Sequence, residues 1–522
     1  MNNFDVIVIG SGINSLTAAF LLGQAGRKVT LLEAREQIGG MSSTEEFAKG
    51  FRCNTINDYI RWIDPRLLAA LNLKDYGLVL NSPDIVRISL EEEGKHIAFH
   101  RSHKKTAASI KQHSEPDAEK WSEFTNFIAK CTRFLEPLYA LTPPTAPKFG
   151  FRDTLKFKSL LKPLLKQGTK GLTDLIRLIP MMMPELMDEW FESEFLRGAV
   201  SSAGITRLTQ GPFSAATGLN FLHQHVHARG IIHNAFFVQG GTDQFARALT
   251  LAAKSAGVKI QTKTKVRSIN TANGICSGIT TNDGKMIPSD IVVSGLDPRH
   301  TFLKLVGASE LSPTFTTQLK NIKYRGSTAR VHFALNTLPE IKEVSIDQMD
   351  TVFSVSPSID YLERAYDNSK YGRISDNPYL EFTFPSIQNP DFAPDGKHVL
   401  SASLQYIPYH LCDGKWTKEM QNKVIQNVNG VIEKYIPGFT DIVENTALRT
   451  PVDLEAQFGL TEGNLNHGEM TLDQFFFMRP TMNAAQYHTP IQNLFLCGPG
   501  THPGGGLHGA NAVNAIHEIT KY

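Results

Sequence analysis

The chain has little cysteine: five residues among 522, with no two in a Cys-x-x-Cys pair. An odd number of widely spaced thiols argues against a disulfide framework and predicts a reducing compartment. Disulfide-exchange chemistry and a zinc cluster both need closely spaced cysteines, so this spacing excludes them. The five residues are Cys53, Cys131, Cys276, Cys412 and Cys497.

The chain also lacks an excess of charge and a long hydrophobic run. The 53 lysines and arginines nearly balance the 51 aspartates and glutamates, so nothing in the charge favours nucleic acid as a partner. No run reaches the roughly 18 unbroken apolar residues of a spanning helix. Asp5 stands where a signal peptide would build its hydrophobic region. We expect no signal peptide, no transmembrane segment, and a cytoplasmic protein, with peripheral contact to membranes left open.

The amino-terminal stretch "DVIVIGSGINS" has the pattern of a βαβ unit. A strand buried on both faces is predicted over residues 5–9, followed by a glycine turn and a helix that ends near Ala25. The next segment, "KVTLLEA", predicts a second parallel strand that ends at Glu33. Strand, turn, helix and acidic residue together match the dinucleotide-binding fingerprint, although Ser15 stands where that fingerprint has its third glycine.

The residue types in this turn suit a pyrophosphate. Gly10 allows the tight bend, Gly12 lets the backbone approach the ligand, and the helix N-terminus supplies unpaired N–H groups. Glu33, about 20 residues further on, is placed to accept hydrogen bonds from ribose hydroxyls, which disfavours a 2′-phosphate and NADP. The third glycine serves helix-to-strand packing, so we interpret Ser15 as a packing substitution.

Two further glycine-rich loops favour a flavin over a nicotinamide. The segment "AREQIGGMSST" gives a second loop of close approach after Glu33. Near the end of the chain, "NLFLCGPGTHPGGGLHGANAV" reads as a strand, a glycine-rich loop and a helix that begins near Gly509. A helix N-terminus aimed at the N1–C2 edge of a flavin would stabilise the negative charge of the reduced ring, which nicotinamide does not require.

In these motifs the chain resembles the flavin-dependent carotenoid desaturase and isomerase family of the phytoene desaturase type. There the amino-terminal fingerprint, an "EARxxxGG" stretch and a "GxGTHPGxG" loop all bind FAD. The resemblance continues through "FFVQGGTDQFARALTLAAKSAGVKI" and "HGEMTLDQFFFMRP", so it spans most of the chain. It implies an α/β fold: a Rossmann-type, glutathione-reductase-like FAD-binding domain with a mixed α+β substrate domain.

The resemblance also implies which residues hold FAD, with Val266 binding the adenine through its backbone. By the same analogy His502 lies near the ring, where it would donate a hydrogen bond or a proton; the alternative is that it orders its own loop. The residues assigned to FAD are Gly10, Gly12, Ile13, Asn14, Glu33, Ala34, Arg35, Gly40, Met41, Val266, Gly498, Gly500, Gly509 and Ala510.

The cofactor domain is predicted to be discontinuous, built from residues 1–75, 232–300 and 480–522. Residues 76–231 and 301–479 are predicted to form the substrate domain, with helices that could face a membrane. No second dinucleotide fingerprint follows, so we expect electrons to leave the flavin to oxygen, a quinone or another separate acceptor.

Two segments allow more than one interpretation. The first segment, residues 155–190, carries lysines along one helical face. It is either an interfacial helix that admits a lipid-soluble substrate or a helix with a solvated basic face over a core stripe. In "FLHQHVHARG", His223 and His227 lie one helical turn apart, but metal binding needs more ligands, so we expect packed histidines and no metal. The lysines are Lys156, Lys158, Lys162, Lys166 and Lys170.

The expected function is that of an FAD-dependent oxidoreductase acting on an apolar small molecule, polyunsaturated ones included. It would dehydrogenate, desaturate or isomerise that substrate by hydride transfer to the flavin N5 atom, within a tunnel lined by Phe, Leu and Met. Two alternatives stay open. One is a flavin amine oxidase, which would surround its amine with an aromatic cage, and the other is a non-catalytic regulatory protein that binds FAD or an apolar ligand.

Overall fold

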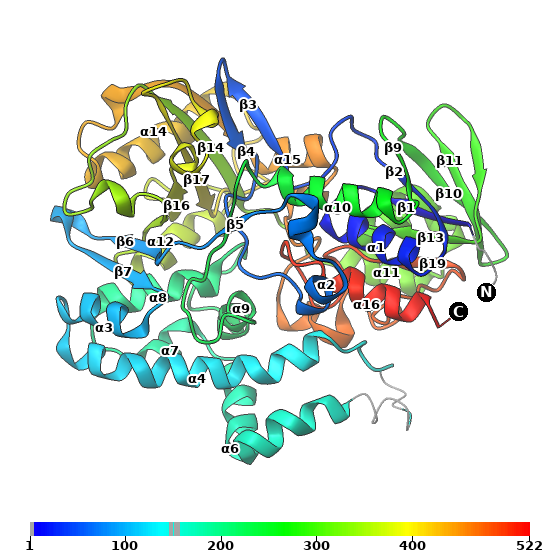
Figure 1. Ribbon diagram of the computed structural model, residues 1–522, viewed down its shortest axis with the longest axis horizontal. Coiled ribbons are helices and arrows are strands. Elements are labelled where there is room, and N and C mark those ends of the chain that lie inside the picture. Colours follow the sequence, from blue (N-terminus) through cyan, green and yellow to red (C-terminus); the bar gives the residue numbers. More distant parts are fainter. Residues whose placement is uncertain (1–4, 146–149, 151–156, 522) are drawn as a thin grey trace.

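A computed structural model describes residues 5–145, 150 and 157–521 of the chain. It is an α/β structure with a parallel sheet at one end, a larger mixed sheet at the other and a layer of helices alongside (Figure 1). Both sheets are built from segments that lie far apart in the sequence.

The parallel sheet has five strands in the order β19-β13-β1-β2-β9. Alternate residues of β1 enter different cores, Val6 and Val8 on one face and Ile7 and Ile9 on the other, which explains the continuous apolar run. The strands are β1 (Asp5–Ile9), β2 (Lys28–Leu32), β9 (Lys259–Gln261), β13 (Ile291–Ser294) and β19 (Leu494–Leu496).

Helices cover one face of this sheet and a small antiparallel sheet covers the other. On the first face α1 (Ile13–Gln24) packs against α10 (Asp243–Ser255) and α16 (Ala510–Ile519). On the second face lies the small antiparallel sheet, whose strand order is β10-β11-β12. Its strands are β10 (Val266–Ala272), β11 (Ile275–Thr281) and β12 (Met286–Pro288). The five parallel strands fall within residues 1–75, 232–300 and 480–522, the segments predicted to form the cofactor domain. The boundaries of a separate substrate domain stay a prediction.

The larger sheet has seven strands in the order β18-β14-β17-β16-β15-β6-β7, antiparallel throughout except where β15 pairs with β6. Helix α14 (Lys418–Tyr435) covers one face through Val424, Val428, Val431 and Ile432, the spacing of one apolar helical stripe. The strands are β6 (Ile85–Leu90), β7 (His96–His100), β14 (Thr328–Leu335), β15 (Val352–Val355), β16 (Leu380–Thr383), β17 (His398–Gln405) and β18 (Val443–Arg449).

The remaining elements form the helical layer and the joints between the sheets. In the layer are α3 (His103–Lys111), α4 (Glu115–Tyr139), α6 (Leu161–Leu178), α7 (Met183–Asp188), α8 (Glu194–Ile205) and α9 (Thr217–Gln224). The others are α2 (Pro65–Ala70), α11 (Pro313–Asn321), α12 (Ile359–Lys370), α13 (Pro385–Gln388), α15 (Pro451–Phe458) and the strand pairs β3 (Thr44–Ala48) with β4 (Phe51–Asn54) and β5 (Leu80–Asn81) with β8 (Phe237–Val238).

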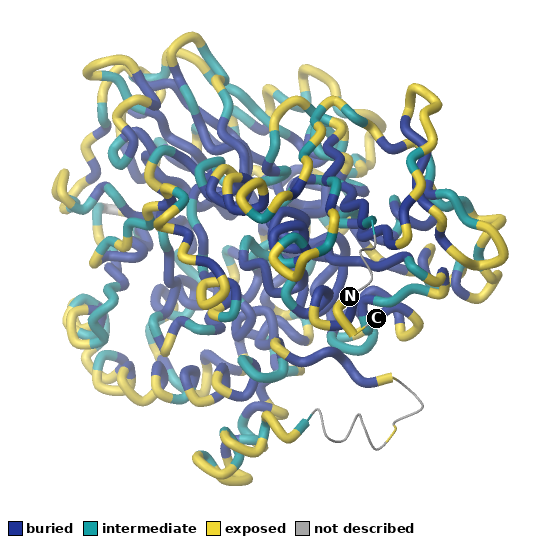
Figure 2. The backbone as a smooth tube through the Cα atoms, turned by 45° about the vertical axis from the view of Figure 1, so that its right-hand side comes forward, coloured by how far each residue is buried: buried dark blue, intermediate teal, exposed yellow. Residues whose placement is uncertain are grey.

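Helix α6 projects from the body of the molecule, and much of its length is exposed (Figures 1 and 2). Its backbone breaks at Gly168, which has φ +66°. Leu161 and Leu165 are 54% and 84% exposed. Lys156 lies outside the described residues, so the predicted row of lysines is seen from Lys158 onward. Within the described part of the chain, no helix combines the length and hydropathy needed to span a bilayer.

Candidate cofactor site and adjoining cavity

A cavity opens at the carboxyl ends of β1 and β2. This is the edge at which open parallel sheets bind their ligands. The turn after β1, residues 10–15, forms one wall, and residues 32–35 and 39–41 continue it. Residues 264–266 and 456–460 line the cavity as well. The cavity is therefore assembled from segments spread over most of the chain.

The turn after β1 leaves backbone donors and open space toward this cavity. Gly10 has φ +90°, and its amide donates to the Leu32 carbonyl at 2.8 Å. Gly12 is the N-cap of α1, with φ −64° and no side chain bonded to the first N–H groups. A Cβ on Gly12 would meet no protein atom within 4 Å. The free donors and the open approach suit the pyrophosphate of a dinucleotide.

Ser15 is accommodated because residue 295, at the end of β13, is glycine. A Cβ built on Gly295 would lie 1.9 Å from the Ser15 Oγ atom, and one on Gly10 would lie 3.6 Å from it. The serine side chain therefore occupies the space that a larger residue 295 would need. The Ser15 side chain makes a packing contact between α1 and the end of the neighbouring strand, and it does not enter the open space at Gly12.

Glu33 is held in place at the end of β2. The Ser11 hydroxyl donates to its Oε2 atom at 2.5 Å, and the Arg35 amide donates to Oε1 at 2.8 Å. Each oxygen keeps a further lone pair, so the carboxylate can still accept from ribose hydroxyls. The Arg35 guanidinium donates to the Gly40 carbonyl at 3.2 Å and lies over the Phe458 ring, 4.6 Å from its centroid.

Most residues assigned to FAD from the sequence lie around this cavity, but the carboxyl-terminal ones are displaced from it. Gly498, Gly500, Gly509 and Ala510 are not among its lining residues, whereas Pro499, Gly506 and Leu507 are. Those in the lining are Gly10, Gly12, Ile13, Asn14, Glu33, Ala34, Arg35, Gly40, Met41 and Val266. Lining residues that the sequence reasoning left out include Ser11, Gly39, Thr264, Lys265, Gly295, Leu296, His300, Phe458, Leu460 and His467.

A second cavity adjoins the first and shares Gly506 and Leu507 with it. The sequence predicts an apolar tunnel of Phe, Leu and Met for the substrate, whereas charged and amide side chains line much of this cavity. Its charged lining residues are Asp58, Arg61, Arg207, Arg330 and Glu381.

Alternation along the strands of the larger sheet explains the polar lining. In β17, Leu400, Ala402 and Leu404 belong to the core beneath α14, whereas Ser403 and Gln405 line the cavity. Side chains alternate faces along a strand, so one face of the sheet is apolar and the other polar. The alternating segments "ARVHF" and "LSASLQ" carry this signal in the sequence.

The two carboxylates in the cavity wall are already paired. Glu381 accepts from Arg87 Nη2 at 2.7 Å and from the Tyr59 and Tyr379 hydroxyls at 2.6 and 2.7 Å. Burial alone would raise the pKa of Glu381, but Arg87 and its other partners outweigh it and lower that pKa to about 2. Asp58 pairs with Arg330. Neither carboxylate is a free base at neutral pH.

The histidines near the joint of the cavities are buried and uncharged at neutral pH. Burial lowers the pKa of His223 to about 4; its Nε2 lies 2.8 Å from the Gly505 carbonyl and its Nδ1 2.9 Å from the Tyr139 hydroxyl. His508 stacks on Trp62 with ring centroids 4.1 Å apart, and burial lowers its pKa to about 3. No group of three or more metal-ligating side chains occurs among the described residues.

His502 lines neither cavity. It is fully buried, and its Nε2 lies 2.9 Å from the Leu138 carbonyl. Burial lowers its pKa to about 3. This placement favours the loop-ordering alternative, and a catalytic role for His502 stays a prediction.

Arg479 joins the glycine-rich loop to the segment that precedes it. Its guanidinium is 1% exposed and donates to backbone carbonyls only, those of Asn466, Gly468, Glu469, Gln474, Pro499 and Thr501. Burial lowers its pKa to about 10, so it keeps its charge at neutral pH. One side chain thus ties Asn466, in the lining of the second cavity, to Pro499, in the lining of the cofactor cavity.

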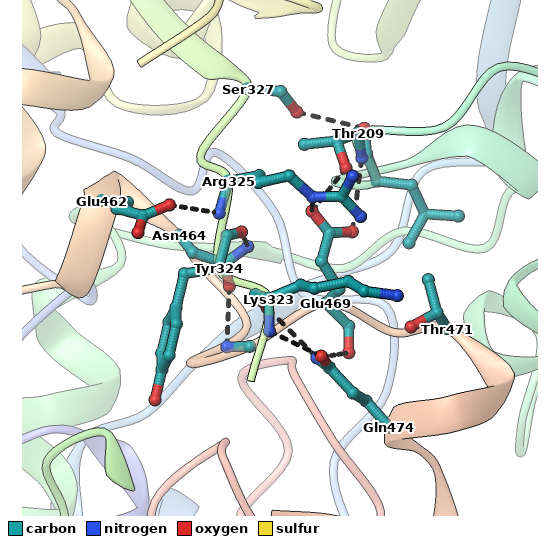
Figure 3. A network of polar contacts seen from close by, with 12 residues as sticks. Thr209, Lys323, Tyr324, Arg325, Ser327, Glu462, Asn464, Glu469, Thr471 and Gln474 are labelled. Carbon is teal, nitrogen blue, oxygen red and sulfur yellow. Dashed lines mark hydrogen bonds and ion pairs between the residues drawn. The ribbon is translucent and has the colours of Figure 1, made fainter. Parts of the chain in front are cut away.

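Glu469 lies beside this joint in a network of polar contacts (Figure 3). The side chain is fully buried and accepts from the Thr209 hydroxyl at 2.5 Å. The Arg325 Nε atom is 3.9 Å from its carboxylate. Burial outweighs these partners and raises the pKa of Glu469 to about 7. Gln474 donates to the Lys323 and Glu469 carbonyls and ties the network to the backbone.

Comparison with known proteins identifies the cofactor. The model of the family described as flavin containing amine oxidoreductase matches residues 16–512. The rat protein called pyridine nucleotide-disulfide oxidoreductase domain-containing protein 2 is 30% identical over 99% of this chain and 93% of its own length. One of the limonene dehydrogenase subunits of Castellaniella defragrans is 26% identical over 99% and 94%.

More distant matches agree with the resemblance found in the sequence. A lycopene-forming phytoene desaturase of Pseudescherichia vulneris is 24% identical over 97% of this chain and 96% of its own length, which confirms the resemblance to that type. The solved structure of cyclohexylamine oxidase from Brevibacterium oxydans superposes with a TM-score of 0.59 at 14% identity, covering all of both chains. That likeness confirms the fold. The cavity residues described above fit FAD.

Proposed function

Because the chain belongs to the flavin containing amine oxidoreductase family and is an FAD-dependent oxidoreductase, we propose that it dehydrogenates a small molecule held in the second cavity. The observation that carries this proposal is the shared wall: Gly506 and Leu507 line both the cofactor cavity and the second one. A substrate in the second cavity would meet the cofactor at this wall.

FAD, when bound, supplies the acceptor for a hydride. The chain's own residues would bind and orient the two molecules. The N-terminus of α1 and the glycines at 10 and 12 would hold the pyrophosphate, and Glu33 would accept from ribose hydroxyls. Arg479 would keep the glycine-rich loop fixed during the reaction.

Acid–base catalysis has little support in this geometry. Glu381 is ionised and accepts hydrogen bonds at both oxygens, and His223 and His508 at the joint are uncharged and bonded to a backbone carbonyl. Removal of a hydride from carbon needs few such groups, because the cofactor does the organic chemistry. The proposal of a dehydrogenation, desaturation or isomerisation rests on this match and on the similarity to the limonene dehydrogenase of Castellaniella defragrans.

The substrate needs polar groups as well as an oxidisable carbon. A wholly hydrocarbon molecule would displace water from the charged cavity wall without replacing its hydrogen bonds, which is unfavourable. We therefore propose a substrate that combines an apolar part with a polar end. Oxygen and a quinone remain the proposed electron acceptors.

Amine oxidation is the second candidate, favoured by the family description and by the likeness to cyclohexylamine oxidase. Tyr59 and Tyr379 supply aromatic rings in the cavity. However, three arginines face the same space, and positive charges disfavour a protonated amine. A third candidate, a non-catalytic FAD or apolar-ligand carrier, requires the same cofactor site but no turnover.

Peripheral membrane contact is a proposal that rests on α6 alone. Its exposed Leu161 and Leu165 stand beside lysines on a projecting helix, which suits an interface with anionic lipid. Sedimentation of the protein with phosphatidylserine vesicles tests it; equal recovery of Leu165→Asp and the native protein in the pellet would contradict it.

Anaerobic reduction of the flavin tests the main proposal. The purified protein should be yellow, and its absorbance near the flavin maximum should bleach on addition of the right substrate. A colourless protein that does not take up FAD would contradict an oxidoreductase. Release of ammonia and peroxide from amines would favour the amine oxidase, and a yellow protein that no substrate bleaches would favour the carrier.

A further inference from the structure

The second cavity has two cationic side chains with no anionic partner. Among its charged lining residues, Asp58 is paired with Arg330, and Glu381 with Arg87 behind it. No ion pair joins Arg61 or Arg207 to a carboxylate among the residues that the structure describes. With both carboxylates already neutralised, these two guanidinium groups give the cavity an excess of positive charge.

Arg61 lines the cavity and has bonding capacity left. Its Nη2 atom donates to the Tyr59 hydroxyl at 3.2 Å, and the guanidinium lies 5.4 Å from the Tyr59 ring centroid. Its Nη1 atom is buried and has no hydrogen-bond partner. Buried donors in folded proteins are nearly always bonded, so this nitrogen could donate to an acceptor that the protein does not supply. Arg61 lines the cavity together with Gly505, Gly506 and Leu507 of the glycine-rich loop.

Arg207 is fixed in an unusual backbone conformation. It has φ +59°, a region that side chains other than glycine enter at some energetic cost and that clusters at functional sites. Its amide donates to Gln405 Oε1 at 3.2 Å, and its carbonyl accepts from Asn466 at 3.2 Å. The neighbouring elements therefore impose the conformation, with the side chain in the cavity wall.

Arg207 also stands close to the cofactor cavity. Its guanidinium donates to the Asn57 amide oxygen, and the Asn57 amide nitrogen donates to the Met41 carbonyl at 3.1 Å. Met41 lines the cofactor cavity. A single side chain, that of Asn57, would therefore separate a group bound by Arg207 from the lining of the cofactor cavity.

We propose that Arg61 and Arg207 bind an oxyanion of the substrate, a carboxylate or a phosphate, and that the substrate is an acid and not a neutral hydrocarbon or an amine. This inference rests on the proposed function. Guanidinium groups match both oxyanions in geometry, and each charge-assisted bond exceeds a neutral one in strength. The anion would offset the repulsion between the two cations.

Calorimetric titration of the FAD-loaded protein with four probes of similar size tests the charge requirement. The probes are benzoate, phenyl phosphate, benzamide and benzylamine. We expect benzoate or phenyl phosphate to bind about tenfold to a hundredfold more tightly than benzamide, and benzylamine most weakly. The tighter of the first two identifies the oxyanion. Equal binding of benzoate and benzamide, tighter binding of benzylamine, or no binding of either anion overturns the proposal.

Arg61→Met and Arg207→Met test the residues, with Arg364→Met as the matched control on the exposed surface, where its side chain is 83% exposed. Each cavity variant should weaken anion binding about tenfold to a hundredfold, and the control should not. If a methionine variant does not fold, Arg61→Lys and Arg207→Lys replace it and should lose less. Folded variants that keep native affinity overturn the assignment.

The binding measurement needs no turnover, so it separates this inference from the proposed function. A protein that binds benzoate through the two arginines but whose flavin no substrate reduces would contradict the dehydrogenase and leave the anion site intact. A protein whose flavin is readily reduced by a neutral substrate, but that binds neither benzoate nor phenyl phosphate, would support the dehydrogenase and contradict the anion site.

Discussion

Gly12 gives the sharpest test of the cofactor site, because a methyl group there changes the ligand's space and little else. The backbone has φ −64°, which alanine adopts without strain, and an added Cβ meets no protein atom within 4 Å. Gly12→Ala should therefore leave the apoprotein as stable as before, or more stable by about 0.4–1 kcal/mol through the unfolded chain. The same Cβ would stand where the backbone must approach the pyrophosphate.

The expected loss of FAD affinity follows from that overlap. One extra methyl in a filled space costs about 1–3 kcal/mol, which corresponds to roughly a 5- to 150-fold rise in the dissociation constant of FAD. Fluorescence quenching of FAD titrated with apoprotein measures this constant, and urea unfolding of the apoprotein measures stability. The native protein should also gain more thermal stability from added FAD than the variant does.

Gly430 supplies a matched control on α14. It too has an ordinary φ, and a Cβ added to it would meet no protein atom within 4 Å, but it is exposed and lines neither cavity. Gly430→Ala should bind FAD as the native protein does. If Gly12→Ala bound FAD with native affinity while its apoprotein remained folded, the assignment of the turn to the pyrophosphate would be refuted.

Three further predictions concern the joint between the cavities. Arg479→Met should destabilise the fold by about 3 kcal/mol or more in urea, because it leaves several buried carbonyls without a donor; an effect as small as that of Arg364→Met would contradict this. The pKa of Glu469 is raised from 4.5 to about 7, so the native state binds the proton more tightly and stability should fall by about 3 kcal/mol between pH 4.5 and 7. Glu469→Gln should remove most of that slope, and an unchanged pH profile of urea unfolding would refute it. His502→Gln should cost about 1 kcal/mol of stability and leave turnover of the flavin-loaded enzyme within about twofold; a tenfold loss of turnover would support catalysis instead.

The amino-terminal half of the cofactor site could be predicted because its chemistry is local. A strand, a glycine turn and a helix within one short segment determine where Gly10 and Gly12 stand, and Glu33 ends the next strand. Ser15 departs from the fingerprint and was interpreted as a packing substitution. The space for its side chain depends on Gly295, a residue that no local sequence pattern connects with it.

The carboxyl-terminal half was harder to predict because its glycines serve packing. A Cβ on Gly498 would lie 2.5 Å from the Gly295 carbonyl, and one on Gly500 would lie 2.6 Å from Pro298. Their small size therefore lets chain segments approach each other. The residues of this region that line the cofactor cavity are Pro499, Gly506 and Leu507. The charges of the second cavity escaped prediction for a similar reason, since Arg61 and Arg207 meet only in the folded chain.

The position of β19 has a consequence for biosynthesis. This strand forms an edge of the parallel sheet beside β13, and the loop after it supplies the wall between the cavities. The ribosome makes β1 first and β19 among the last elements, so a nascent chain holds the start of the dinucleotide turn long before the sheet is complete. Cofactor capture should therefore follow synthesis of β19 and the loop after it, and pulse-labelled ribosome-bound chains that stop before β19 should not retain FAD.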